Sequence, residues 1–330
     1  MVNSWLISGG CGFIGTSLIR TILDQDPNCN IRVLDNLSVG TREDLSEITA
    51  FKELSLDELA KPSEPGSVEL VVGDIRDANA THLSAQGIDC IVHLAANTGV
   101  GPSVEDPRLD LESNVIGTFN MLEAARMQDV SKFILASSGA PIGELKKPPI
   151  HEELPAHPVS PYGASKLACE GYCSAYYHSY GVKTVMLRFG NVYGPRSKHK
   201  ASVVAKFIKN AIAGEICEIY GDGSQTRDFI FIDDLTDAVI RSSGVDVGGE
   251  IFQIASSREV TVNELASSVE RALLEYGVKM KVVNGEKRVG DVQRNFSDTS
   301  KAKRLLGWES NVELKRGVGL TAKYFLDLTR

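Results

Sequence analysis

The sequence predicts an α/β fold: a doubly wound parallel sheet with a smaller C-terminal α/β lobe. Three observations predict it. Short apolar runs alternate with helical patterns along the chain. The runs are continuously apolar, which is typical of strands buried on both faces. A glycine-rich turn, Gly9–Gly15, separates the first run from the first helical pattern. With 330 residues, 42% hydrophobic and 24% charged, the chain can bury a large core.

The expected strands follow from the apolar runs in chain order: 5–8, 31–35, 68–72, 90–94, 133–137 and 184–189. Residues 41–67 are expected to form a surface excursion, because they end in the proline-rich stretch before Gly66. Residues 190–195 are expected to be a loop, and the later helices are assigned to the smaller lobe. A late run, 250–254, is expected to return to the sheet.

The glycine turn predicts a dinucleotide site. A strand, a tight glycine turn and a helix together let main-chain N–H groups approach a diphosphate at the start of the helix. The second run ends at Asp35, 20 residues after Gly15. An acid at that distance normally holds the ribose 2′-hydroxyl of NAD. Residues 1–188 are therefore interpreted as an NAD-binding Rossmann domain, with the returning strand near 250–254 added to it. Residues 189–330 are interpreted mainly as the second lobe.

Tyr162 and Lys166 are candidate catalytic residues. A helix that begins near Ser160 and Pro161 places them on one face, one turn apart. Free tyrosine has a pKa of about 10, so a tyrosine that accepts a proton near neutral pH needs positive charge beside it. The alternative is an amphipathic helix with a core tyrosine and a solvated lysine.

Composition excludes several classes of function. A net charge of −8 without a basic run argues against nucleic acid as the main partner. No apolar stretch approaches the length of a membrane span, and the first residues lack a signal-peptide pattern, so we expect no membrane partner and a cytoplasmic location. The six cysteines have no paired metal-ligand spacing, which predicts reduced thiols and no metal site.

A series of motifs in order extends this interpretation across the chain: Gly9-x-x-Gly12-x-x-Gly15, Gly73-Asp74-Ile75, His93-Leu-Ala-Ala96, Asn114-x-x-Gly-Thr118, Ser137-Ser138, Tyr162-x-x-x-Lys166, Arg188-Phe-Gly-Asn191-Val-Tyr-Gly-Pro195, Gly221-Asp-Gly223 and Arg227-Asp228-Phe-Ile230. With these motifs the chain resembles the extended short-chain dehydrogenase/reductase family, and within it the nucleotide-sugar epimerases and dehydratases. The resemblance implies NAD, a nucleoside-diphosphate sugar such as a UDP-sugar, and hydride chemistry usually at C4. It also implies a homodimer paired through the helices near 108–127 and 162–180.

The resemblance assigns residues to three roles. The implied catalytic residues are Ser138, Tyr162 and Lys166. The implied cofactor-binding residues are Gly9, Gly12, Phe13, Ile14, Gly15, Asp35, Asn36, Asp74, Ile75, Leu94, Ala95, Ala96, Asn114, Tyr162 and Lys166. The implied substrate-binding residues are Asn191, Tyr220, Arg227, Arg288, Asp291 and Asn295. The alternative for Asp74 and Asn114 is a structural role in a turn or a helix cap. The alternative for Arg227 and Arg288 is an ordinary surface position.

One departure from the family pattern bears on the reaction. After Ser138 the chain reads Gly139-Ala140-Pro141-Ile142, where dehydratases carry an Asp-Glu pair and decarboxylases a glutamate. Glycine and alanine cannot move a proton, so elimination lacks its acid and base. The departure favours C4 epimerisation through a transient 4-keto sugar. Dehydration, decarboxylation or net reduction of a nucleotide sugar, UDP-glucuronate included, remain alternatives, as does a non-catalytic dinucleotide-binding module.

The resemblance also bears on which sugar fits the site. Asn295 matches a family position that borders the C2 substituent of the sugar. Asparagine is small and can hydrogen-bond an acetamido group, which favours UDP-N-acetylhexosamine alongside UDP-glucose and UDP-galactose. The basic run Lys198-His199-Lys200 offers a uronate carboxylate an alternative partner. Against a uronate, Gly101 stands where several uronate-handling relatives have an arginine.

Overall fold

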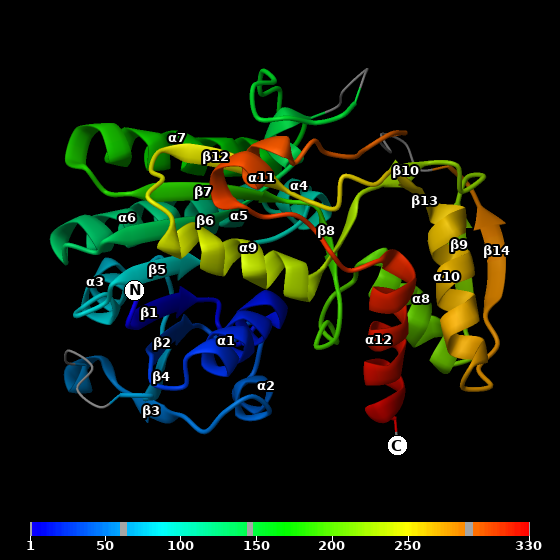
Figure 1. The fold of residues 1–330 in the computed structure, drawn as a ribbon, viewed down its shortest axis with the longest axis horizontal. Helices are drawn as coiled ribbons and strands as arrows, with labels where there is room; N and C mark the ends of the chain where they lie inside the picture. The colour runs from blue at the N-terminus through cyan, green and yellow to red at the C-terminus, as the bar shows by residue number, and fades with distance from the viewer. Residues whose placement is uncertain (1, 60–64, 144–147, 288–292, 330) are drawn as a thin grey trace.

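The computed structural model describes residues 2–59, 65–143, 148–287 and 293–329. Its largest element is a parallel sheet with the strand order β12-β7-β6-β5-β1-β2-β4-β3 (Figure 1). The strands are β1 (Ser4–Ser8), β2 (Asn30–Asp35), β3 (Lys52–Leu54), β4 (Val68–Val72), β5 (Cys90–His93), β6 (Lys132–Ser138), β7 (Thr184–Phe189) and β12 (Glu250–Ile254). The direction of winding reverses between β1 and β5, and this is where ligands bind in doubly wound sheets. The predicted fold class is confirmed.

Helices cover both faces of this sheet. Trp5 and Ile7 of β1 pack into a core shared with α1 (Phe13–Gln25) and α9 (Ile232–Gly244). Leu6, between them, packs into a second core on the opposite face. That face is covered by α3 (Ala78–Ser84), α6 (Gly117–Met127) and α7 (Pro161–Tyr180). Because alternate side chains serve two separate cores, the strands are apolar throughout.

Shorter segments complete this half of the molecule. They are α2 (Arg42–Ser46), a 3₁₀ turn (Leu56–Glu58), α4 (Val100–Glu105), α5 (Pro107–Asp110), a π-helical segment (Leu111–Ile116) and a second 3₁₀ turn (Ala140–Ile142). The π-helical segment joins α5 to α6 without a break in the helical backbone.

The second lobe lies at the right of Figure 1 and is built around three packed helices, α8 (Val203–Ile212), α10 (Val262–Leu274) and α12 (Leu314–Asp327). Beside them β9 (Ile216–Tyr220) pairs in parallel with β14 (Lys281–Gly285). Two short pairs link the lobe to the main sheet: β8 (Asn191–Tyr193) with β11 (Phe229–Phe231), and β10 (Thr226–Arg227) with β13 (Val260–Thr261).

Three expectations from the sequence are wrong in detail. The excursion at 41–67 contains β3, whose short, partly charged sequence gives no strand signal. The expected loop at 190–195 contains β8, which is ordered by pairing with β11 rather than by its own pattern. Two later helices that were assigned to the smaller lobe, α9 and α11 (Ser300–Leu306), pack against strands of the main sheet. Within the described residues, no helix has both the length and the apolar character needed to cross a membrane.

Candidate active site

The glycine turn forms a bare, closely packed cradle at the start of α1. Gly9 has a positive φ of 71°, and a Cβ there would lie 2.8 Å from the main-chain nitrogen of Ala95. A Cβ at Gly15 would lie 2.5 Å from the Cα of Gly10. Gly12 is the N-cap of α1, so the free N–H groups of Phe13 and Ile14 stand at the positive end of the helix. This cradle fits the diphosphate of a dinucleotide.

Asp35 lies at the end of β2 and is tied to the same turn. Its carboxylate accepts hydrogen bonds from the main-chain N–H groups of Cys11 and Leu37, both at 2.9 Å. Burial raises the pKa of Asp35, and the two hydrogen bonds act against that rise. Each oxygen keeps a further lone pair for a ligand hydroxyl. Asp35 therefore both shapes the turn and faces the cradle's edge.

Asn36 and Asp74 come together beside Asp35. The Asn36 amide donates to Asp74 at 3.1 Å, and Arg76 makes a bidentate contact with the same carboxylate. The hydrogen bond from Arg76 is the main cause that lowers the pKa of Asp74 to about 2. Ile75 is buried against Gly117 at the start of α6. Asp74 is consequently an ionised acceptor, fixed where an adenine is expected.

Asn114 belongs to the π-helical segment, and its side-chain amide is hydrogen-bonded at both its oxygen and its nitrogen. Its amide oxygen accepts from the main-chain N–H of Asn97 at 2.8 Å, and its amide nitrogen, with two N–H groups, lies 2.9–3.0 Å from acceptors on Asn97, Asp110 and Ser165. These bonds join the segment after β5 to α7. Leu94 and Ala95, just before Asn97, donate main-chain hydrogen bonds to Ser8 of β1, so residues 94–96 lie beside the glycine turn. Single-turn π-helices occur frequently at functional sites.

The three candidate catalytic residues come from two adjoining elements. Ser138 ends β6, and Tyr162 is in the first turn of α7, which begins at Pro161 after the cap Ser160, as predicted. Lys166 is buried and donates to the main-chain oxygen of Ala136 at 2.9 Å. A Cβ at Gly163 would lie 2.7 Å from the Ala140 carbonyl oxygen, so the start of α7 is pressed against the residues that follow Ser138.

An ion pair that the sequence analysis did not identify lies behind this cluster. Glu170, one turn after Lys166, pairs with Arg188 of β7 at 2.7 Å, and each side chain is 3% exposed. Ser137 donates to Glu170 at 2.6 Å. The pair joins α7, β6 and β7 in the interior. Glu170 continues the Tyr162–Lys166 helical face, and that spacing is the only signal in the sequence.

A neutral histidine lies on the cofactor side of the cluster. Burial, together with the charge of Lys166, lowers the pKa of His93 to about 3. Its ring nitrogens contact the hydroxyl groups of Ser8, at 2.7 Å, and Thr118, at 3.1 Å. His93 therefore links β1, β5 and α6 as an uncharged side chain.

The described candidate substrate residues lie in two places, one around Thr226 and Asp228 and the other beside a pocket at Tyr220. Arg227 and Asn295 both contact Thr226: the Arg227 guanidinium donates to the Thr226 carbonyl at 2.7 Å, and the main-chain N–H of Asn295 donates to the threonine hydroxyl at 3.3 Å. Asn191 donates to the Asp228 carbonyl at 3.2 Å. Tyr220 lines a pocket of about 280 Å³ together with Gly221, Asp222, Ser224, Gln225, Lys287 and Gln293. Arg288 and Asp291 lie outside the described residues.

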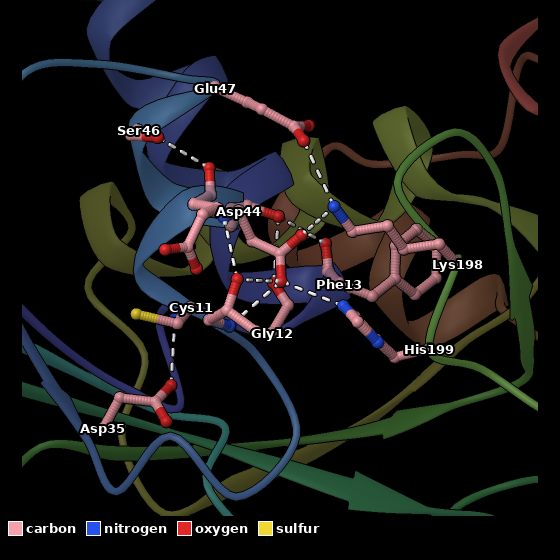
Figure 2. A network of polar contacts seen from close by, with 12 residues as sticks. Cys11, Gly12, Phe13, Asp35, Asp44, Ser46, Glu47, Lys198 and His199 are labelled. Carbon is pink, nitrogen blue, oxygen red and sulfur yellow. Dashed lines mark hydrogen bonds and ion pairs between the residues drawn. The ribbon is translucent and has the colours of Figure 1, made fainter. Parts of the chain in front are cut away.

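Lys198 and His199, the first two residues of the basic run, point toward Asp44 beside the glycine turn (Figure 2). Lys198 lies 2.5 Å from one oxygen of Asp44 and 3.1 Å from Glu47, and His199 lies 3.0 Å from the other oxygen of Asp44. Asp44 belongs to α2 and Glu47 caps it. Lys198 and His199 are thus occupied by carboxylates of the N-terminal half. The sequence analysis gave no role to Asp44 or Glu47.

The six cysteines are free and buried. The described residues bring no three metal-ligating side chains together.

Comparison with known proteins agrees with this geometry. Residues 6–321 match the family model described as GDP-mannose 4,6 dehydratase. A UDP-glucose 4-epimerase of Mycolicibacterium smegmatis is 36% identical over 324 residues, covering 97% of each chain. The crystal structure of UDP-glucose 4-epimerase from Thermotoga maritima with UDP-glucose superposes with a TM-score of 0.87, at 32% identity, covering 99% of this chain and 100% of that one. The UDP-glucose 4-epimerase of Thermus thermophilus, solved with NAD, gives 0.83 at 33% identity, covering 98% and 99%.

Proposed function

The chain belongs to the extended short-chain dehydrogenase/reductase family, and from this premise we propose that it is an NAD-dependent nucleotide-sugar 4-epimerase. The observation that carries the proposal is the combination of the glycine cradle with Tyr162 and Lys166 on the first turns of α7. Its relatives include UDP-glucose 4-epimerases, one of them solved with NAD.

In the proposed reaction Tyr162 accepts the proton of the sugar O4 hydroxyl, and Ser138 donates a hydrogen bond to the same oxygen. Lys166 lies on the same face of α7 and stabilises the phenolate form of Tyr162 that accepts this proton, and its ammonium is held by the Ala136 carbonyl of β6. Bound NAD supplies reversible hydride acceptance at C4. Tyr162 then returns the proton to O4 after the 4-keto sugar has turned its other face toward the cofactor.

The residues after Ser138 support epimerisation over dehydration. Gly139 caps the 3₁₀ turn Ala140–Ile142, which begins with Ala140 and packs against α7. Neither residue carries a group that can move a proton at C5 or C6. A dehydratase remains the second candidate because the matching family model takes its description from one. Incubation with a panel of UDP- and dTDP-sugars, read by mass spectrometry and NMR, tests the proposal: epimerisation conserves mass, and dehydration removes one water.

The residue assignments divide between the two halves of the chain. We assign the dinucleotide to residues 1–188 with the strand at 250–254, and the nucleotide sugar mainly to residues 189–330. Within the second half, the pocket beside Tyr220 is suited to the base, and Arg227 to the diphosphate. Arg288 and Asp291 retain the roles that the family resemblance implies.

For the sugar, we propose that a UDP-N-acetylhexosamine is epimerised at least as well as a UDP-hexose. Asn295 is held near Arg227 through Thr226 and is smaller than a tyrosine. Activity on UDP-glucose or UDP-glucuronate with none on UDP-N-acetylglucosamine contradicts this assignment. Asn295→Tyr is expected to lose the N-acetylated substrate selectively, because added bulk penalises the larger C2 group.

A homodimer is the proposed assembly. Exposed apolar side chains gather on the helices between 108 and 127 and on α7: Leu109, Leu111, Ile116, Phe119, Met127, Tyr172 and Tyr180. Phe119 and Tyr172 meet edge to face at 5.9 Å, which joins the two helices into one surface. Such a surface is typical of a subunit interface. We also propose a cytoplasmic location, which the six free thiols support. Light scattering of the native protein tests the dimer.

A further inference from the structure

The segment that follows β8 connects the second lobe to the cofactor cradle. Lys198 and His199 bind the two oxygens of Asp44, and Lys198 also binds Glu47 (Figure 2). Lys198 is about a quarter exposed, at 27%, and Asp44 is less so, at 10%. The contact between Asp44 and His199 joins residues that are 155 positions apart in the sequence. These contacts fix where the next residue, Lys200, can lie.

The Asp44 carboxylate is held in place by hydrogen bonds at the start of α2. It accepts hydrogen bonds from the main-chain N–H of Thr41, at 2.9 Å, and from the Thr41 hydroxyl, at 3.1 Å, in the capping box of α2. Partial burial acts to raise the pKa of Asp44, but the hydrogen bonds from Lys198, Thr41 and His199 outweigh it and lower the pKa. A Cβ on the neighbouring Gly40 would overlap the main chain of Cys11, so the start of α2 rests directly on the glycine turn.

Lys200 carries a charge that the described residues leave without a counter-ion. Its ammonium nitrogen lies 5.4 Å from the centre of the Phe13 ring, and Phe13 is the first residue of α1. Its hydrogen-bond partner is the Val192 carbonyl, at 3.4 Å, which is a long and weak contact. Burial lowers the pKa of Lys200 to about 8. A partly buried cation beside the positive end of a helix is unfavourable unless an anion lies between them.

We propose that Lys200 is a dinucleotide-binding residue whose ammonium pairs with the diphosphate of the bound cofactor, and that Asp44 positions it by holding Lys198 and His199. The diphosphate then has the N–H groups at the start of α1 on one side and a cation from the second lobe on the other. The inference rests on the proposed NAD site and is independent of which sugar reacts.

The first test compares Lys200→Met with the native protein in the exchange of bound NAD for isotopically labelled NAD. We expect the NAD dissociation rate to rise at least about tenfold, the loss typical of one charge-assisted contact. Lys200→Arg is expected to retain most of the native rate because it keeps the charge. Lys303→Met is the matched control, since Lys303 is an exposed lysine (66%) of α11 that pairs with Glu309. An unchanged rate in Lys200→Met overturns the proposal.

A second test separates a diphosphate contact from a general loosening of the site. The affinities of ADP-ribose and of adenosine are measured by their competition with NAD for the cofactor-depleted protein. Lys200→Met is expected to weaken ADP-ribose and leave adenosine unchanged, because adenosine has no phosphate. Equal weakening of both overturns the assignment. A native protein that binds neither overturns the proposed cofactor site itself, so the two failures are distinguishable.

A third test isolates the positioning role of Asp44. Asp44→Asn also disturbs the cap of α2, so the double variant Lys198→Met/His199→Asn is added because it leaves Thr41 and Asp44 bonded to each other. Either change is expected to speed NAD release in the native background and to have little further effect when Lys200→Met is already present. Additive effects contradict a role exerted through Lys200.

Discussion

The ammonium nitrogen of Lys166 lies 6.0 Å from the centre of the Tyr162 ring, on the same face of α7. The Ala136 carbonyl holds the ammonium in place from β6. A fixed positive charge near the phenol stabilises the phenolate that proton transfer requires. This relationship is the structural basis for the assignment of Tyr162 as the proton acceptor.

Replacing that phenol tests the assignment. Tyr162→Phe keeps the ring and its packing, so we expect the fold and NAD binding to survive. Turnover is expected to fall at least about 100-fold, the low end for loss of general acid–base catalysis. Ser138→Ala is expected to impair turnover as well, through the lost hydrogen bond to O4. Steady-state kinetics with circular dichroism as the folding control measure both variants. Near-native turnover of Tyr162→Phe rules out the proposed role.

Cofactor choice follows from Asp35. Its carboxylate is oriented by Cys11 and Leu37, and neither Asn36 nor Leu37 offers a cation for a 2′-phosphate. Arg42, the first basic residue after Asp35, is already bound to Glu53. We expect NAD to bind at least about tenfold, or about 1.4 kcal/mol, more tightly than NADP. Calorimetric titration measures the ratio, and equal affinities count against Asp35.

The buried pair Glu170–Arg188 is expected to be important for stability. Glu170→Ala leaves Arg188 charged in the interior and removes the acceptor of Ser137. Breaking such a pair costs about 3–5 kcal/mol of unfolding free energy. The control is Asp237→Ala, which removes an exposed pair with Arg241 and is expected to cost less than about 1 kcal/mol. Urea denaturation measures both, and similar losses in the two variants contradict the interpretation.

The affinity for NAD is expected to depend on pH through Lys200. Burial lowers its pKa to about 8 in the free protein, and only the ammonium form pairs with a diphosphate. Affinity is therefore constant below pH 8 and falls as the pH rises through 8. Other charged groups lie around Lys200. Lys209 of α8 donates to the main-chain oxygens of Lys198 and Lys200. Asp44 of α2 and its C-cap Glu47 are already paired with Lys198 and His199. Fluorescence titration with NAD between pH 7 and pH 9, a range of about one unit on either side of the pKa, measures the fall in affinity. Lys200→Arg is expected to abolish this fall.

Much of the N-terminal half of the chain could be predicted because its signals are local. The glycine turn, the acid at Asp35 and the Tyr162–Lys166 spacing each lie within one strand–turn–helix unit or one helix. Contacts between distant segments could not be predicted in this way. The bond between Asp44 and His199 spans 155 positions, and neither residue has a local pattern that points to the other. Similarly, β8 is a strand because β11 lies beside it.

Reversible oxidation at C4 of a nucleotide sugar can be followed with a UDP-sugar that carries deuterium at C4. The protein is incubated with it in ordinary water, without added cofactor, and the product is analysed by mass spectrometry and NMR. We expect a C4 epimer of unchanged mass that retains the deuterium at C4, because the same hydride leaves and returns. A product lighter by one water, or an epimer that has exchanged its deuterium for solvent hydrogen, would contradict it.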